Sequence, residues 1–175
     1  KGEEGELWLA STQLMRGYHK DPRGTSDVLK DGWLRTGDLV SELDSGHLVL
    51  VGRKKNQIIS GGRNISPEEV AAVLNLHPRV IEAVVLGNPD PEWGERVVAL
   101  VVAETGGTDE ADLAEWCRSR LSEYKVPKEI LFVEQLPKGP SGKVRIEAAR
   151  QLLDKQLVRM ANVVQKDEAL IDRLL

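Results

Sequence analysis

The run GRKKNQIISGGRNISPEEV at residues 52–70 combines basic side chains, a glycine pair and a helix start. Gly61 and Gly62 precede Ser66, which suits a helix N-cap, and Glu69 then completes a capping box. A glycine turn before a helix N-terminus can bring backbone amides close to a phosphate or another polar ligand. The same pattern suits a plain strand–turn–helix connection, in which glycine only satisfies the backbone angles. Spacing alone leaves both interpretations open.

Two charged side chains are candidates for recognising a sugar. Asp38 follows a glycine in WLRTGD, and a carboxylate beside a glycine turn can accept hydrogen bonds from two vicinal hydroxyls, as in dinucleotide sites. Arg53 begins the run RKK, and an arginine can make forked hydrogen bonds to hydroxyl or phosphate oxygens. A turn aspartate that caps its own backbone and a solvated basic face are the simpler alternatives.

Two later groups of side chains could also bind a ligand. Lys143 ends PSGK just before an expected helix, where it can deliver a point charge to a phosphate or carboxylate oxygen. GPSGK is a poor match to a Walker phosphate loop, because it lacks the four-residue spacer between glycines. Trp93, Tyr124 and Lys128 can hold an adenine and its phosphates by stacking and charge. An exposed loop lysine and aromatic rings packed under loops are the alternatives.

Two groups of elements must position these residues. About residues 1–51 hold mostly strands and turns, with a polar, turn-rich stretch at 11–31 and a hairpin whose arms are LVSEL and HLVLVGR. After Lys55, helices interleave with strands. We therefore expect an α/β (α+β) fold, in which a short β-rich N-terminal subdomain precedes a small C-terminal domain of sheet covered by helices. The expected elements of the second group are strands at 56–60, 80–87, 95–104 and 129–136, and helices at 66–76, 109–122 and 145–160.

Composition limits the class of function. The chain has 175 residues and a net charge of −4, which gives no support for a nucleic-acid partner or a membrane surface. No apolar run is long enough to span a membrane. Cys117 is the one cysteine, so a reducing, cytoplasmic compartment is the simplest context, and three scattered histidines predict no metal site. The chain begins at Lys1 and enters a strand-like run at once, so we expect a piece of a longer polypeptide.

The order of the motifs is more specific than any one of them. WLRTGD, a hairpin, GRKKNQIISGGRNISPEEV and LPKGPSGK closely resemble the adenylate-forming acyl-CoA synthetase superfamily, which includes acyl-CoA ligases, peptide-synthetase adenylation domains and luciferases. The resemblance covers about residues 5–150. It implies that a carboxylic acid and ATP form an acyl-adenylate, and that the thiol of CoA or of a carrier protein then attacks and releases AMP. A small C-terminal domain swings between two poses to serve the two steps.

The resemblance also implies the domains and the residue roles. Residues 1–53 would end the large AMP-binding domain, 54–160 would form the mobile domain, and 161–175 would be a helical extension. The matched positions are Asp38 and Arg53 on the ATP ribose, Lys55 at the hinge, Lys143 in adenylation, Gly61 and Gly62 along the pantetheine channel, and Trp93, Tyr124 and Lys128 near the CoA nucleotide.

Some features depart from the family pattern. Asn56 and Gln57 follow the hinge where relatives often have an acid and an apolar residue, and Arg63 replaces a common acid, although none of the three touches a reacting atom. The loop that holds the ATP phosphates and the acid pocket belong to the large domain. We therefore expect an acid–CoA ligase fragment, inactive in isolation, that uses CoA and ATP with Mg²⁺ bound mainly by the missing N-terminal domain. Fatty acid metabolism is one setting. An adenylation domain loading a carrier protein and a stand-alone, non-catalytic CoA- or nucleotide-binding module are the alternatives.

Overall fold

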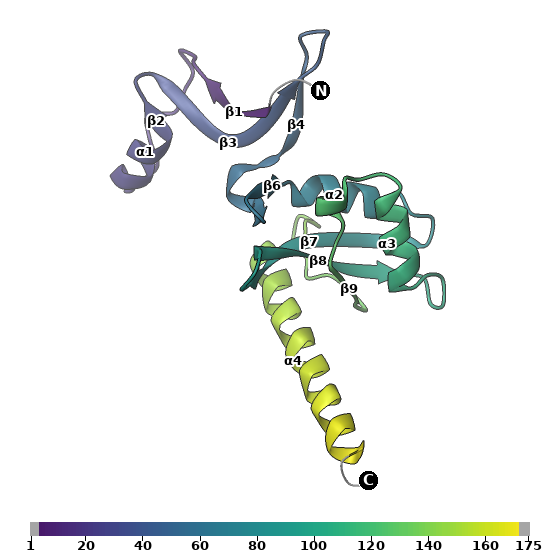
Figure 1. Ribbon diagram of the computed structural model, residues 1–175. Coiled ribbons are helices and arrows are strands. Elements are labelled where there is room, and N and C mark those ends of the chain that lie inside the picture. Colours follow the sequence, from purple (N-terminus) through teal and green to yellow (C-terminus); the bar gives the residue numbers. More distant parts are fainter. Residues whose placement is uncertain (1–3, 172–175) are drawn as a thin grey trace.

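The computed structural model describes the backbone of residues 4–171 and the side chains of residues 4–159. Two sheets are separated along the chain, and three helices surround the second sheet (Figure 1). The expected α/β (α+β) class, with a β-rich first part and a helix-covered second part, is confirmed.

The first sheet centres on β3 (Trp33–Glu42). This strand pairs antiparallel with β1 (Glu4–Leu9), β2 (Leu29–Lys30) and β4 (Leu48–Arg53). The β3–β4 hairpin is the one that the sequence predicts. A short helix, α1 (Pro22–Val28), lies in the stretch expected to be polar and turn-rich. Asp21 caps it by accepting a hydrogen bond from the Gly24 N–H, so the Asp-Pro pair was the start signal that the sequence analysis missed.

The second sheet has the order β6-β5-β8-β7, with β9 also paired to β8. Its pairs are antiparallel except β8–β9, which is parallel. A single 3₁₀ turn, η1 (Lys54–Asn56), connects it to β4. The strands are β5 (Ile58–Ser60), β6 (Arg63–Ile65), β7 (Val80–Asp90), β8 (Gly94–Ala103) and β9 (Glu129–Phe132).

Strand β7 continues to Asp90, so the expectation that it ends before Asn88 is wrong. The Ala83 N–H donates to Asn75 Oδ1 and the Gly87 carbonyl accepts from Arg150, so the backbone groups of Ala83 and Gly87 face away from β8. Pro89 is an even number of residues from both along the strand, so its backbone nitrogen also faces away from β8. A proline there removes no ladder donor, which is why the strand tolerates it.

Side chains that alternate along β7 and β8 build a core on each face of this sheet. Helices α2 (Pro67–Asn75) and α3 (Glu110–Arg118) cover one face, and α4 (Ile146–Ile171) covers the other (Figure 1). Leu74, Val97 and Leu113 belong to the first core, and Val98 and Leu153 belong to the second. The helix backbone continues from the expected 145–160 into the proposed extension as far as Ile171, and residues 172–175 lie outside the described part. No helix in the described part has the length and apolar character that a membrane span requires.

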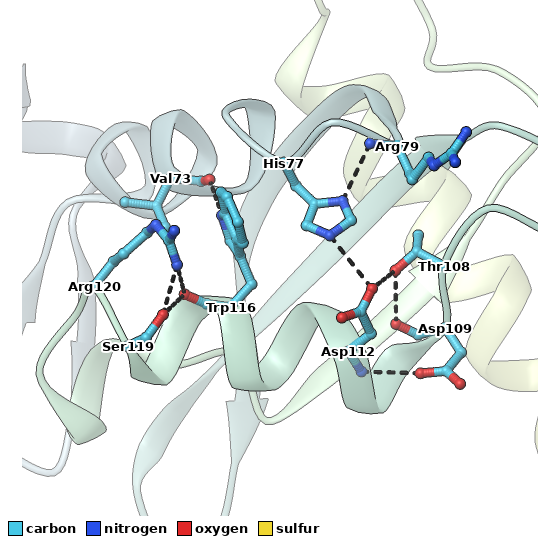
Figure 2. Close-up of polar contacts among 9 residues, drawn as sticks. All are labelled: Val73, His77, Arg79, Thr108, Asp109, Asp112, Trp116, Ser119 and Arg120. Carbon is cyan, nitrogen blue, oxygen red and sulfur yellow. Dashed lines mark hydrogen bonds and ion pairs between the residues drawn. The ribbon is translucent and has the colours of Figure 1, made fainter.

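Polar contacts join α2 to α3 on the first face (Figure 2). His77 is 7% exposed, its Nδ1 accepts from the Arg79 N–H, and its Nε2 lies 3.3 Å from Asp112 Oδ2. The Thr108 hydroxyl donates to the same carboxylate oxygen at 2.6 Å, and the Trp116 ring meets the imidazole edge-on. Because the hydroxyl binds the carboxylate and not the imidazole, these residues lack the arrangement of a nucleophilic triad. They hold the two helices together.

Candidate functional site

Asp38 and Arg53 lie opposite each other on β3 and β4. Arg53 Nε is 2.6 Å from Asp38 Oδ1, an oxygen that is enclosed and meets no described donor at a hydrogen-bonding angle, so the contact is an ion pair. Asp38 lies within β3 and its N–H donates to Thr36 Oγ1, so its amide is bound by the threonine hydroxyl, not by its own carboxylate. The side chains remain 23% and 52% exposed. The hairpin therefore presents an acceptor and a donor together, a combination suited to sugar hydroxyls.

Lys55 lies in the middle of η1, between the two units. Its side chain is exposed, and its ammonium has no hydrogen-bond or ion-pair partner within residues 4–159. Lys54 Nζ is 3.0 Å from Glu6 Oε2 in β1, and Asn56 Nδ2 donates to Glu68 Oε1 in α2. The two neighbours of Lys55 therefore bind different units, which suits a pivot.

Gly61 and Gly62 form the turn between β5 and β6, with φ values of +55° and +74°. The Gly61 N–H donates to the Trp93 carbonyl, and a Cβ at Gly61 would lie 2.9 Å from Trp93 Cε3. A Cβ at Gly62 would meet nothing within 4 Å. Gly61 is thus required by the packing of Trp93, whereas Gly62 leaves its backbone open to close approach.

Tyr124 and Lys128 are held by different contacts, Tyr124 by the residue after this turn and Lys128 by β8. Arg63, which follows the glycines, has its Cζ 4.6 Å from the Tyr124 ring centroid, a cation–π geometry. The exposed Lys128 precedes β9, and its N–H donates to Val97 O in β8. The structure therefore brings Gly61 into direct contact with Trp93, and brings Tyr124 into contact with Arg63, the residue after the turn. The role of Arg63 was missed, because no local signal links residues so far apart in the sequence.

Lys143 lies on a second turn, which Lys138 and Val144 close through a β-bridge. Gly142 has a φ of +77°, and the Gly139 N–H donates to the Lys143 carbonyl at 2.9 Å. The Lys143 side chain is exposed, and its ammonium has no partner within the described part. No contact joins it to Asp38 or Arg53 in this arrangement.

Among the residues whose side chains are described, two ionisable groups have shifted pKa values. The Lys54 hydrogen bond lowers the pKa of Glu6 below its ordinary value, and burial of the side chain opposes this. Burial raises the pKa of the Cys117 thiol to about 11, with a smaller opposing effect of Arg120. In the part of the chain that was described, no three acidic, histidine or cysteine side chains gather as metal ligands.

A cavity of about 580 Å³ lies apart from most of these residues. Lys55 in η1, Ile58 in β5, Leu86 in β7 and Arg150 in α4 are among the residues that line it. Its lining includes neither Asp38 nor the two glycine turns. The candidate site is therefore an exposed set of turns and strand ends, and does not lie in this cavity.

Residues 69–143 match the family described as AMP-binding enzyme C-terminal domain. These residues form an AMP-binding enzyme C-terminal domain. The chain is 41% identical over 141 residues to the long-chain-fatty-acid–CoA ligase FadD13 of Mycobacterium tuberculosis, covering 81% of this chain and 28% of that protein. It is 45% identical over 146 residues to the sulfoacetate–CoA ligase of Cupriavidus necator, covering 82% of this chain and 29% of that protein.

Solved structures agree with this family. The o-succinylbenzoate CoA synthetase of Bacillus subtilis, in complex with the acyl-adenylate OSB-AMP, matches with a TM-score of 0.78 and 35% identity over 86% of this chain and 30% of that one. The amide bond synthetase McbA of Marinactinospora thermotolerans matches with a TM-score of 0.79 and 39% identity over 87% of this chain and 32% of that one. The resemblance to adenylate-forming enzymes is thereby confirmed. The chain spans about 30% of the length of the relatives it matches.

Proposed function

We propose that this AMP-binding enzyme C-terminal domain belongs to an ATP-dependent carboxylic acid–CoA ligase, which forms an acyl-adenylate and then a CoA thioester. The Asp38–Arg53 pair carries the proposal, because residues of two separate motifs on the arms of one hairpin become an acceptor–donor pair that remains partly exposed to solvent. The matched relatives named as CoA ligases support it.

In the adenylation step, the Asp38 carboxylate would accept hydrogen bonds from the ribose hydroxyls of ATP and Arg53 would donate to them. Lys143 would place its charge between the α-phosphate and the substrate carboxylate, where two negative groups must approach each other. Because Lys143 lies in the second unit and Asp38 in the first, a rotation about Lys55 is the simplest way to bring them to one nucleotide.

In the thioester step, the turn at Gly61 and Gly62 would approach the pantetheine of CoA. The open space above Gly62 allows backbone contact with a narrow chain. Trp93, Tyr124 and Lys128 would then face the nucleotide of CoA, with Arg63 holding the Tyr124 ring.

The remainder of the large domain is the partner we propose. Within residues 4–53, Leu39 is the one buried apolar side chain, whereas Trp33, Leu48 and Leu50 are 46%, 54% and 64% exposed. Exposed apolar groups of this kind mark a surface that another part of a protein covers. We assign the acid pocket, the ATP phosphates and Mg²⁺ to that domain, and infer that residues 1–175 alone have no ligase activity.

Lys143→Ala in a full-length enzyme containing this chain tests the proposal. We expect pyrophosphate release with ATP and a carboxylic acid to fall about 10²–10³-fold, the usual cost of removing one preorganised charge donor. Thioester formation from a supplied acyl-adenylate should be spared, and Lys155→Ala, an exposed lysine on α4, should affect neither step. Equal loss of both half-reactions would reject the role of Lys143. Turnover by residues 1–175 alone would reject the fragment proposal.

The carboxylic acid that is activated and the acceptor of the acyl group can be identified by testing a panel of each. The matched relatives are named for different acids, and one solved relative is an amide bond synthetase. Acyl transfer should therefore be compared for CoA, a phosphopantetheinylated carrier protein and an amine. Preference for the carrier protein would favour an adenylation domain. Tight calorimetric binding of CoA or AMP by residues 1–175 alone would favour a non-catalytic binding module.

A further inference from the structure

A short hydrogen bond joins the two units. Ser66 Oγ, at the N-cap of α2, donates to the carbonyl of Val51 in β4 at 2.6 Å. The same oxygen accepts from the Glu69 N–H at 3.2 Å, so a single hydroxyl caps a helix of the second unit and binds a strand of the first. Glu68 Oε2 lies 3.2 Å from this hydroxyl, but the proton can serve one acceptor at a time and the shorter contact is to Val51.

The backbone beside Val51 is shaped for this contact. Gly52 is buried with a φ of +153°, and a Cβ there would lie 2.9 Å from Ser66 Oγ and 2.8 Å from Glu68 Oε2. A side chain at residue 52 would force the Ser66 hydroxyl and the Glu68 carboxylate to move. The contact between the Ser66 hydroxyl and β4 therefore depends on glycine at this position.

Rotation about Lys55 affects the contacts around the hinge differently. The Lys54–Glu6 pair joins η1 to the first unit, and the Asn56–Glu68 hydrogen bond joins it to the second, so both can persist during a rotation at Lys55. The Ser66–Val51 bond connects β4 directly to α2, and it must break when these elements separate.

We propose that the Ser66 hydroxyl is a positioning group that favours the domain pose seen here over the second pose of the reaction cycle. This inference rests on the two-pose function proposed above. A hydrogen bond of ordinary net strength changes the ratio of two poses about fivefold. Loss of the hydroxyl should therefore release the second unit without touching any substrate-binding residue.

The pose can be measured directly in residues 1–175. Spin labels at Asp44→Cys, in the β3–β4 turn, and Thr105→Cys, after β8, report the distance between the units, while the buried Cys117 stays unlabelled. Pulsed electron–electron double resonance gives the populations of the two inter-label distances. We expect Ser66→Ala to raise the population at the second distance, relative to the first, about fivefold. Ser66→Thr keeps the hydroxyl and should restore the original distribution.

A matched variant separates pose from capping. Asp109 caps α3 by accepting from the Asp112 N–H at 2.9 Å, far from the contact between units. Asp109→Ala should lower the melting temperature to a similar extent as Ser66→Ala and leave the distance distribution unchanged. A shift of equal size in Asp109→Ala would mean that cap loss alone changes the distances, which would overturn the proposal.

An unchanged distribution in a folded Ser66→Ala protein would also overturn it. If Ser66→Ala unfolds, Ser66→Asp decides, because the carboxylate keeps the cap and faces the Val51 carbonyl without a proton. A wild-type distribution in Ser66→Asp would then reject the proposal. The measurement needs no substrate, so failure of the ligase proposal appears separately, as absent pyrophosphate release by a full-length wild-type enzyme.

Discussion

Replacing Gly61 by alanine should destabilise the second unit more than replacing Gly62. Both positions have left-handed backbone angles, at which a Cβ costs about 1–2 kcal/mol. The Gly61 methyl would in addition lie 2.9 Å from Trp93 Cε3 and 3.1 Å from Cζ3, and overpacking of this kind costs about 1–3 kcal/mol. Because Trp93 is 49% exposed, its ring can move outward, which places the second cost near its lower limit. We expect a loss of about 2–3 kcal/mol for Gly61→Ala and about 1–2 kcal/mol for Gly62→Ala.

Urea unfolding followed by far-ultraviolet circular dichroism measures both losses. The decisive comparison is a double-mutant cycle with Trp93→Ala, which removes the ring that the methyl would meet. In that background the cost of Gly61→Ala should fall to the value of Gly62→Ala. If Gly61→Ala costs the same with and without the tryptophan ring, the packing of Trp93 does not constrain this turn and the reasoning is wrong.

Two further predictions concern ionisable groups. The Lys54 hydrogen bond lowers the pKa of Glu6 in the folded chain. The stabilisation of the fold by this hydrogen bond is therefore fully present above the ordinary glutamate pKa of about 4.3, and it is lost as the pH falls through the lowered folded value. The difference in unfolding free energy between wild type and Glu6→Gln should therefore be positive at pH 7 and disappear as the pH falls through the lowered folded pKa, and a difference that stays constant across urea titrations at these pH values would contradict this. Burial raises the pKa of Cys117 to about 11, from 9.0 for an ordinary thiol, so at pH 8 a disulfide reagent should modify the native chain about 100-fold or more slowly than the urea-unfolded chain. Equal rates would show that the thiol is not enclosed.

The second unit was largely predictable because its signals are local. The Ser66-Pro67 start of α2 is present, and the apolar runs of β7 and β8 are buried as a sheet interior. Two errors came from rules that depend on context. The Asn88-Pro89 pair predicts a strand end, but Pro89 lies on the outward side of an edge strand. In the first unit, helix α1 has no apolar periodicity in its residues, PRGTSDV, and only the Asp21-Pro22 pair marks its start.

The candidate site was predictable as a set of motifs but not as an arrangement. The sequence placed Asp38 and Arg53 at the two ends of a hairpin, and the strand register then makes them neighbours. The contact between Arg63 and Tyr124 had no sequence signal, because it depends on how the β5–β6 turn meets the segment before β9. Long-range pairs of this kind are set by the tertiary packing of elements, which periodicity and capping do not encode.

The lysines of the site differ from its acid–arginine pair in a way that bears on their role. Lys55, Lys128 and Lys143 are exposed, and no described carboxylate or hydroxyl receives their ammonium groups. Replacing such a side chain usually changes stability by less than about 0.5 kcal/mol, so the fold of this chain does not require a lysine at any of the three positions. The Asp38–Arg53 pair, in contrast, joins β3 and β4 at one end of their register. Function should therefore separate from stability at the lysines and remain coupled to it at the pair, which makes Lys143 the position where loss of activity is most directly interpreted as loss of chemistry.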